Sequence, residues 1–234
     1  IVNVSDVFRF LVCPYKLKFN DSRTDSNFKK DLYATVIHKG VLYKGKNNSI
    51  SFSYLSDSLN KRWTQLKKAD EIHSVSTTTL LEISQKLKGI YTYLNAESET
   101  VAVNYVSFVT IGNFKVKVLV KEISRDRDGM LNFLYCYNES DFHFGSNSIV
   151  PLIYNYLTES IVQQDFGRSY KSTTTVFKSL TGNFNAINKV HRRTKLVPVI
   201  KAVLEAYKNT NLYPISTVYS CRNCDHSNFC DWKY

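Results

Sequence analysis

Most of the five cysteines of this chain lie near its two ends. Cys13 comes early, whereas Cys221, Cys224 and Cys230 form a C-x2-C-x5-C group at the end of the 234 residues. Four thiolates complete the coordination shell of one metal centre. A metal held by all four would join the two ends of the chain and close the fold between them into one unit.

The spacing of the cysteines leaves the metal and its fourth ligand open. A C-x2-C pair offers two thiolates to one metal across a tight turn, and Cys230 can close the loop over it. Cys13 and His226 are both candidates for the remaining position. A tetrahedral zinc site and a 4Fe–4S cluster both agree with this spacing. The fifth cysteine, Cys136, has apolar and aromatic neighbours and is interpreted as a small buried side chain.

The charge balance favours a polyanionic partner. The chain has 31 Lys+Arg against 20 Asp+Glu, a net charge of +11, which is typical of nucleic-acid-binding proteins. No apolar run approaches the roughly eighteen residues that span a membrane, so we expect no membrane partner. The N-terminus lacks the layout of a signal peptide, and the odd number of cysteines favours a reducing compartment. We therefore expect an intracellular, cytoplasmic protein, with nucleoid association left open.

Hydrophobic periodicity predicts helices first and strands afterwards. A short helix capped by Ser5 leads to Cys13, and a second is capped by Asp31. Two amphipathic helices follow, and then the period changes from helical to strand-like after Asn95. The turn Gly112-Asn113 joins two strands of a predicted antiparallel three-strand meander. The predicted helices span 32–44, 54–66 and 80–94, and the predicted strands 100–110, 114–123 and 131–137.

The last third of the chain adds further elements to one α/β domain. The pattern predicts a helix over 148–161, a strand over 173–180 and a long helix from about Ala186 to Lys208 that Pro198 kinks. We expect a single domain over residues 1–234. Its parts are a helical insert at about 31–95, a sheet core at about 99–208, and a metal lobe of Cys13 with residues 213–234.

The flanks of the cysteines resemble a known family. The segment Ser5-x4-Phe10-Leu11-x-Cys13-Pro14-x-Lys16-x-Lys18-Phe19 and the tail Tyr213-Pro214-x6-Cys221-x2-Cys224-x5-Cys230 are similar to the iron–sulfur RecB-like nucleases of the PD-(D/E)XK superfamily. These include the AddB nuclease domain and the RecB-like exonucleases of CRISPR adaptation. The resemblance spans essentially the whole chain. It implies a restriction-endonuclease-like core, a mixed sheet flanked by helices, and a 4Fe–4S cluster on Cys13, Cys221, Cys224 and Cys230, with zinc as the alternative.

The catalytic residues of that family are replaced here. The family holds Mg²⁺ with carboxylates on two adjacent strands, and a Lys follows the second. The matching positions carry Lys121 for the first acid, Tyr135 for the second and Tyr137 for the Lys. Val150 stands at the position of a Gln on the following helix. His38, in Ala34-Thr35-Val36-Ile37-His38, matches the family's metal-approaching His and is interpreted as a relic.

Other acids offer no clear replacement for the missing site. Those near the meander are Glu122, Asp126, Asp128, Glu139 and Asp141. Glu122 adjoins Lys121 and is expected to face the other side of its strand. The acid-x-Lys sequence Asp231-Trp232-Lys233 lies beyond the last cysteine and not on a paired strand. We therefore predict that the chain is not an enzyme, although an active exonuclease with displaced carboxylates stays the first alternative.

Basic residues gather where the family keeps its catalytic cleft. Lys115, Lys117 and Lys121 recur with the period of a strand and should share one face, where they suit phosphate better than Mg²⁺. The predicted DNA-binding surface further contains Arg125, Arg127, Arg192, Arg193 and Lys195. We expect a DNA-binding or scaffolding subunit of a DNA-processing complex. The resemblance implies a helicase, an active nuclease or CRISPR integration proteins as partners; the second alternative is a protein-interaction or decoy module without DNA binding.

Overall fold

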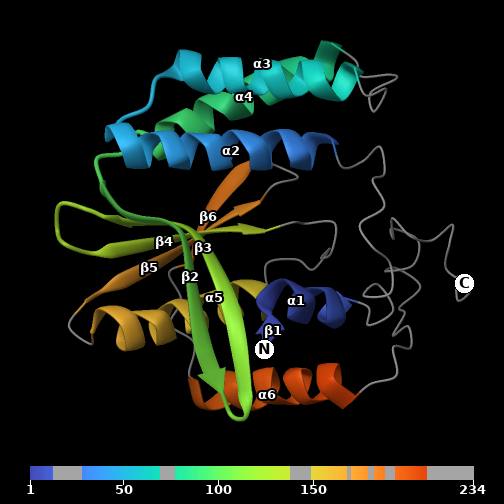
Figure 1. Cartoon of the computed structure of the whole chain (residues 1–234), viewed down its shortest axis with the longest axis vertical. Coiled ribbons are helices and arrows are strands. Elements are labelled where there is room, and N and C mark those ends of the chain that lie inside the picture. Colours follow the sequence, from blue (N-terminus) through green and yellow to red (C-terminus); the bar gives the residue numbers. More distant parts are fainter. Residues whose placement is uncertain are drawn as a thin grey trace, which may run out of the picture.

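The computed structural model describes residues 1–12, 28–68, 77–137, 149–167, 170–178, 182–187 and 193–209. These residues form a mixed α/β fold of three layers (Figure 1). A mixed β-sheet lies in the middle, helices α2, α3 and α4 cover one face, and α1, α5 and α6 cover the other. The predicted α/β class, with a mixed sheet flanked by helices, is confirmed.

Helices α2 (Phe28–Asn47), α3 (Phe52–Lys68) and α4 (Thr77–Leu94) form the helical layer. Their buried apolar side chains pack together and onto the sheet through Leu134 and Phe177. The predicted helices exist, but Asp31 is not a cap. It lies in the first turn of α2, which begins three residues earlier, and it forms an ion pair with Arg62 of α3.

The centre of the sheet is the predicted antiparallel meander. Strands β2 (Glu99–Ile111), β3 (Phe114–Arg125) and β4 (Leu131–Tyr137) pair in chain order. The β2–β3 turn places Gly112 at φ +61°, a conformation that glycine adopts without strain. Strand β5 (Ser172–Lys178) then adds to β4 in parallel.

Two short strands were not expected from the sequence. Strand β6 (Asn183–Ile187) pairs antiparallel with β5, so Ala186 is in a strand and the predicted helix from Ala186 is wrong at its start. Helix α6 spans Arg193–Asn209 and contains Pro198. Strand β1 (Val2–Asn3) pairs in parallel with β3 and runs directly into α1 (Val4–Val12). Ser5 is therefore inside α1 and does not cap it.

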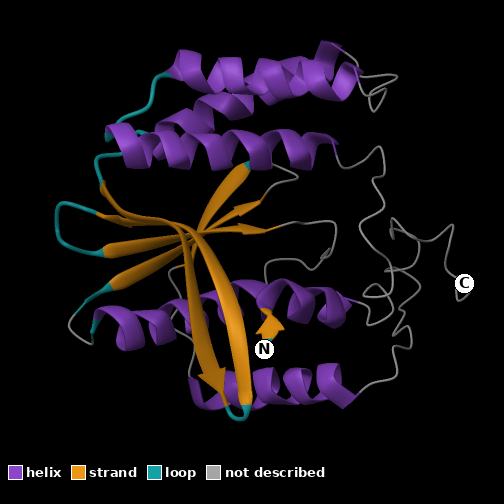
Figure 2. Cartoon of the chain, in the orientation of Figure 1, coloured by secondary structure: helices purple, strands orange, loops and turns teal. Residues whose placement is uncertain are grey.

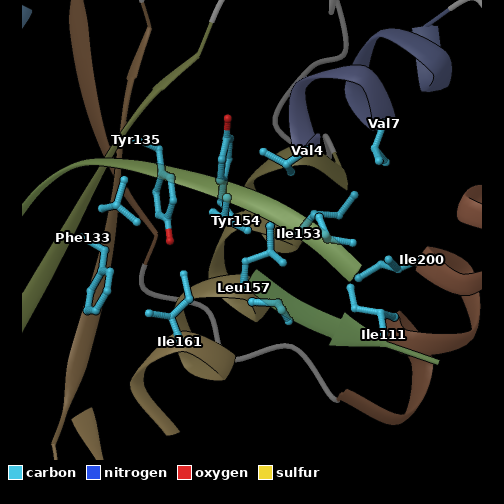
Figure 3. Packing of buried hydrophobic residues seen from close by; sticks show 14 of the residues in the cluster. Val4, Val7, Ile111, Phe133, Tyr135, Ile153, Tyr154, Leu157, Ile161 and Ile200 are labelled. Carbon is cyan, nitrogen blue, oxygen red and sulfur yellow. The ribbon is translucent and has the colours of Figure 1, made fainter. Parts of the chain in front are cut away.

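The second core lies between the sheet and helices α1, α5 and α6. Helix α5 (Ile149–Ile161) continues into a π-helical turn, Val162–Phe166, and its buried side chains meet those of β3 and β4. Figure 3 shows Tyr135 of β4 beside Tyr154 of α5 in this core. Among the described helices, none combines the length and apolar character that crossing a membrane requires.

Candidate nucleic-acid interface

Strand β3 changes its neighbour halfway along its length. Its pairing with β4 reaches from Arg125 to Glu122, and further toward the hairpin turn β1 pairs with Val116 and Lys117 instead. Figure 2 shows the β2–β3 hairpin running away from β4, β5 and β6 beyond this point. We call the point at Lys121, where β3 leaves β4, the fork. The resemblance described above assigns the first catalytic acid to this position.

The fork is positively charged. Lys121 is half-buried, and it lies near enough to His38 of α2 to affect its titration. The pKa of His38 is lowered from its ordinary value first by partial burial and then by the charges of Lys121 and Lys39. The structure thus places near each other two residues, His38 and Lys121, that the resemblance described above assigns to one site. Lys39 is a further member of this site that the sequence reasoning missed.

The position that the resemblance assigns to the second catalytic acid is part of the core. Tyr135 is fully buried, its ring lies 4.4 Å from that of Tyr154, and its hydroxyl is hydrogen-bonded to Thr158 Oγ1 at 2.9 Å. Burial raises the pKa of Tyr135, so the hydroxyl stays protonated. Tyr137 and Val150 belong to β4 and α5, but their side chains lie outside the described residues.

The acids nearest the fork already have partners. Glu122 is buried, and its Oε1 lies 3.1 Å from Lys44 Nζ of α2. Asp126 Oδ1 accepts hydrogen bonds from the backbone N–H groups of Asp128 and Met130 and so shapes the β3–β4 turn. Within the described ranges, no three His, Cys, Asp or Glu side chains are grouped so as to hold a metal ion. Glu139 and Asp141 lie outside the described residues.

The predicted metal ligands also lie outside the described part of the chain. These are Cys13, Cys221, Cys224 and Cys230, with His226 as the alternative fourth ligand. Cys136 of β4 is described, and it packs partly buried against the core of the helical layer. Burial raises the pKa of the Cys136 thiol to about 12, so the thiol is protonated and unreactive at neutral pH, as expected of a packing residue.

The three predicted lysines of β3 lie along the strand as the period of two requires. Lys115 and Lys117 are exposed and Lys121 is half-buried, whereas the alternating residues Val116 and Val118 are buried. The lysines therefore share the face of β3 that points away from the core of α1, α5 and α6.

The predicted arginines are less available for a ligand. Arg125 lies 3.8 Å from Glu99, and Arg127 pairs with Glu97 at the surface. Such exposed ion pairs contribute little to the stability of the fold. Each carboxylate does, however, partly neutralise the positive charge of its arginine. Arg192 lies outside the described residues, as do the side chains of Arg193 and Lys195, both in the first turn of α6.

The described positive surface also contains a residue that the sequence reasoning missed. Lys201 of α6 lies against the β2–β3 turn: a Cβ added at Gly112 would be 3.1 Å from its Cε. The sequence indicates only that Lys201 lies in a helix. It does not indicate the contact with Gly112, because the two residues are far apart in the chain.

Comparison with known proteins gives no family. No family model matches the chain, and no curated protein matches it. One solved structure similar in outline is described as "Crystal structure of SSO0001"; it has 14% sequence identity and a TM-score of 0.34 over 99% of this chain and 97% of that one. A likeness of this size carries no argument about the chain.

Proposed function

We propose that this protein is a catalytically inactive homologue of the iron–sulfur RecB-like nucleases, with a PD-(D/E)XK core, that serves as a DNA-binding or scaffolding subunit of a DNA-processing complex. The observation that carries the proposal is the placement of Lys121 at the fork, close to His38. A nuclease of this family requires a carboxylate at that point, because Mg²⁺ is held by anionic oxygen ligands.

The chemistry of the fork favours phosphate over a metal ion. The ammonium groups of Lys121 and Lys39, which lie near His38, would repel Mg²⁺ but can pair with phosphate oxygens. Tyr135, at the second acid position, is buried in the core and hydrogen-bonded to Thr158. Of the acids that could replace it, Glu122 forms an ion pair with Lys44, and Asp126 accepts hydrogen bonds within a turn. These contacts support a binding role without hydrolysis.

The cofactor that we propose is a 4Fe–4S cluster held by Cys13, Cys221, Cys224 and Cys230. Four thiolates suit such a cluster, although the same donor set also suits zinc. In this chain the group would hold the N-terminal segment to the C-terminal segment. Its contribution is to the stability of the fold, and DNA binding falls to the lysines of β3.

A charge-reversal experiment tests the DNA-binding role. The variant Lys115→Glu/Lys117→Glu/Lys121→Glu should lose affinity for DNA of any sequence, since phosphate contacts do not read bases. Fluorescence anisotropy over a range of salt concentrations should give a shallower salt dependence, by about 0.7 to 0.9 in slope for each phosphate contact removed. The matched control is Lys61→Glu/Lys67→Glu/Lys68→Glu on the exposed face of α3, which changes the net charge equally.

The outcomes of this experiment separate the alternatives. If the control weakens binding as much as the β3 variant, only net charge matters and the β3 face is not the site. If the parent protein has no affinity for DNA even at low salt, DNA binding is wrong. A protein-interaction module then becomes the leading interpretation, with salt-insensitive partner binding as its signature.

An activity assay tests the absence of catalysis. No cleavage of single- or double-stranded DNA is expected with Mg²⁺ or Mn²⁺. Any activity found should be measured again in Asp126→Asn/Asp128→Asn, which keeps the turn geometry but removes its charges. Activity that this change abolishes would establish a displaced metal site and contradict the proposal.

A further inference from the structure

The distal half of the β2–β3 hairpin presents a mixed apolar and basic surface. Its members are three cross-strand pairs, which we call the hairpin outer face: Val106 with Leu119, Phe108 with Lys117, and Thr110 with Lys115. The residues between them, such as Val109, Val116 and Val118, are buried against the core of α1, α5 and α6. The outer face therefore points to the opposite side of the hairpin.

The apolar side chains of this surface are partly exposed. Val106 and Leu119 are 44% and 41% exposed, Phe108 is half-buried, and Lys115 and Lys117 are exposed. Isolated exposed apolar residues are ordinary, but here they are contiguous and lie within one pair of strands.

The charge on this part of the hairpin has one sign. From Thr100 to Ile111, strand β2 has no charged residue, and from Phe114 to Lys121 the only charged residues of β3 are lysines. Lys201 of α6 lies against the hairpin turn and adds another positive charge at its tip. The partner that this face complements is therefore anionic and also has apolar surface to bury.

Phe108 is held beside a cation. Lys115 Nζ lies 4.9 Å from the centroid of its ring, a cation–π contact. Such a contact at an exposed site is worth about 0.5 to 1 kcal/mol, whereas a nucleic-acid base stacked on an aromatic side chain is worth about 1 to 3 kcal/mol. A base can thus displace the ammonium from the ring, and the displaced ammonium is then free to pair with a neighbouring phosphate.

We propose that the hairpin outer face binds single-stranded nucleic acid, with a base stacked on Phe108 and phosphates on Lys115 and Lys117. The inference rests on the proposed DNA-binding function. It adds that the nucleic acid is single-stranded and that Phe108 is the residue that distinguishes a single strand from a duplex. In a duplex the bases are already stacked on one another, so Phe108 would have no free base to contact. In a single strand each base offers a π-face.

Substitution of Phe108 gives the direct test. The ligands are a fluorescein-labelled oligothymidylate of about 20 nucleotides, long enough to cover one site of this kind, and a duplex of the same length. Phe108→Ala should weaken binding to the single strand about 5- to 150-fold, the range expected for one lost base stack. Its affinity for the duplex and its salt dependence should not change, since no charge is removed. Phe108→Trp should retain the affinity for the single strand.

The lysines provide a second, independent readout. Lys115→Gln/Lys117→Gln should reduce the slope of log K against log salt for the single strand by about 1.4, the sum of two contacts of about 0.7 each. Lys67→Gln/Lys68→Gln on α3 is the matched control and should leave the slope unchanged. Circular dichroism and the melting temperature check that each variant is folded.

The failure of this inference differs from failure of the proposed function. If the parent binds neither ligand at low salt, DNA binding itself is wrong, and this inference is wrong with it. If the parent binds DNA but Phe108→Ala binds the single strand as well as the parent, the stacking site is overturned and the proposed function stands. Equal losses for single strand and duplex would also overturn it. If Phe108→Ala loses a protein partner but binds DNA as the parent does, the hairpin outer face is assigned to protein docking instead.

Discussion

Lys44 of α2 and Glu122 of β3 form a buried ion pair, with Nζ 3.1 Å from Oε1 and side chains only 4% and 2% exposed. Thr100 Oγ1 donates a hydrogen bond to the same carboxylate oxygen at 3.0 Å, and Lys44 Nζ donates one to Ser98 Oγ. The pair therefore joins the helical layer to the sheet one residue from the fork. It also commits Glu122 to a structural role.

Removal of one member of this pair should strongly destabilise the fold. Lys44→Met or Glu122→Gln each leaves a buried polar group without its partner, and the cost should be about 3 to 5 kcal/mol when a charge is left unpaired. The double variant Lys44→Met/Glu122→Gln leaves no unpaired charge and should cost less than the two single changes together. Urea denaturation followed by circular dichroism measures each free energy of unfolding.

The more exposed Asp31–Arg62 pair serves as a control for that experiment. Its side chains are 42% and 25% exposed, so Asp31→Asn should change the free energy of unfolding by about 1 kcal/mol or less. A cost as small as this for Lys44→Met would show that water reaches the Lys44–Glu122 pair and would contradict its buried role.

Tyr135 should behave as a packing residue. Tyr135→Phe loses one hydrogen bond and should cost about 1 kcal/mol, since Thr158 keeps its hydrogen bond from Thr174. Tyr135→Ala removes a fully buried ring and should cost about 3 to 5 kcal/mol. Thermal or urea unfolding checks both values. A Tyr135→Ala variant that loses DNA affinity with unchanged stability would instead show that the ring contacts the ligand.

His38 should report the charge of the fork. Its pKa in the folded protein is below the usual value, so the folded state binds a proton less tightly than the unfolded state does. Stability should therefore fall as the pH decreases through about 6.5, the unfolded value. NMR titration of the imidazole should show the lowered pKa. Lys121→Gln should raise it toward the usual value, and Lys39→Gln should raise it less.

Two results would contradict this relation between His38 and Lys121. One is a His38 pKa that Lys121→Gln leaves unchanged, because the two side chains would then not sense each other. The other is an equal rise of the His38 pKa in Lys117→Gln, which would show only the effect of net charge.

Addition of oligonucleotide to the parent should also raise the His38 pKa, because phosphate near the fork favours the protonated imidazole.

The proposed cluster predicts iron and colour. Protein purified without oxygen should be brown and should contain four irons per chain held by Cys13, Cys221, Cys224 and Cys230. Cys13→Ala should lower the melting temperature, because the N-terminal segment loses its link to the C-terminal one. One zinc and no iron would select the zinc alternative. An unchanged melting temperature in Cys13→Ala would remove Cys13 from the ligand set.

The sequence predicts the elements that have a strong local signal. The meander follows from alternation over β2 and β3 and from the Gly112-Asn113 turn, and the amphipathic helices follow from their period. Strand β6 was missed because five residues of mixed exposure show no clear period, and its pairing with β5 decides its conformation. Two residues are too few to predict β1.

Only those features of the candidate site that have a local signal in the sequence could be predicted. The common face of Lys115 and Lys117 follows from the period of a strand. The Lys44–Glu122 pair and the contact of Lys201 with the hairpin turn join residues far apart in the chain, which no local pattern records. The stacking role proposed for Phe108 depends on its neighbours Lys117 and Lys115 on the adjacent strand, and the sequence does not give the pairing register that places them there.

The pairing of β1 with β3 has a consequence for the order of folding. Strands β2 and β3 are joined by a two-residue turn, so the hairpin closes a short loop and can form early. Val2 pairs with Val116, and closing so long a loop costs more chain entropy. We therefore expect the N-terminal strand to dock late, onto a β3 edge that the hairpin has already made rigid. An amide-exchange pulse during refolding would find β2 and β3 protected before Val2 and Asn3.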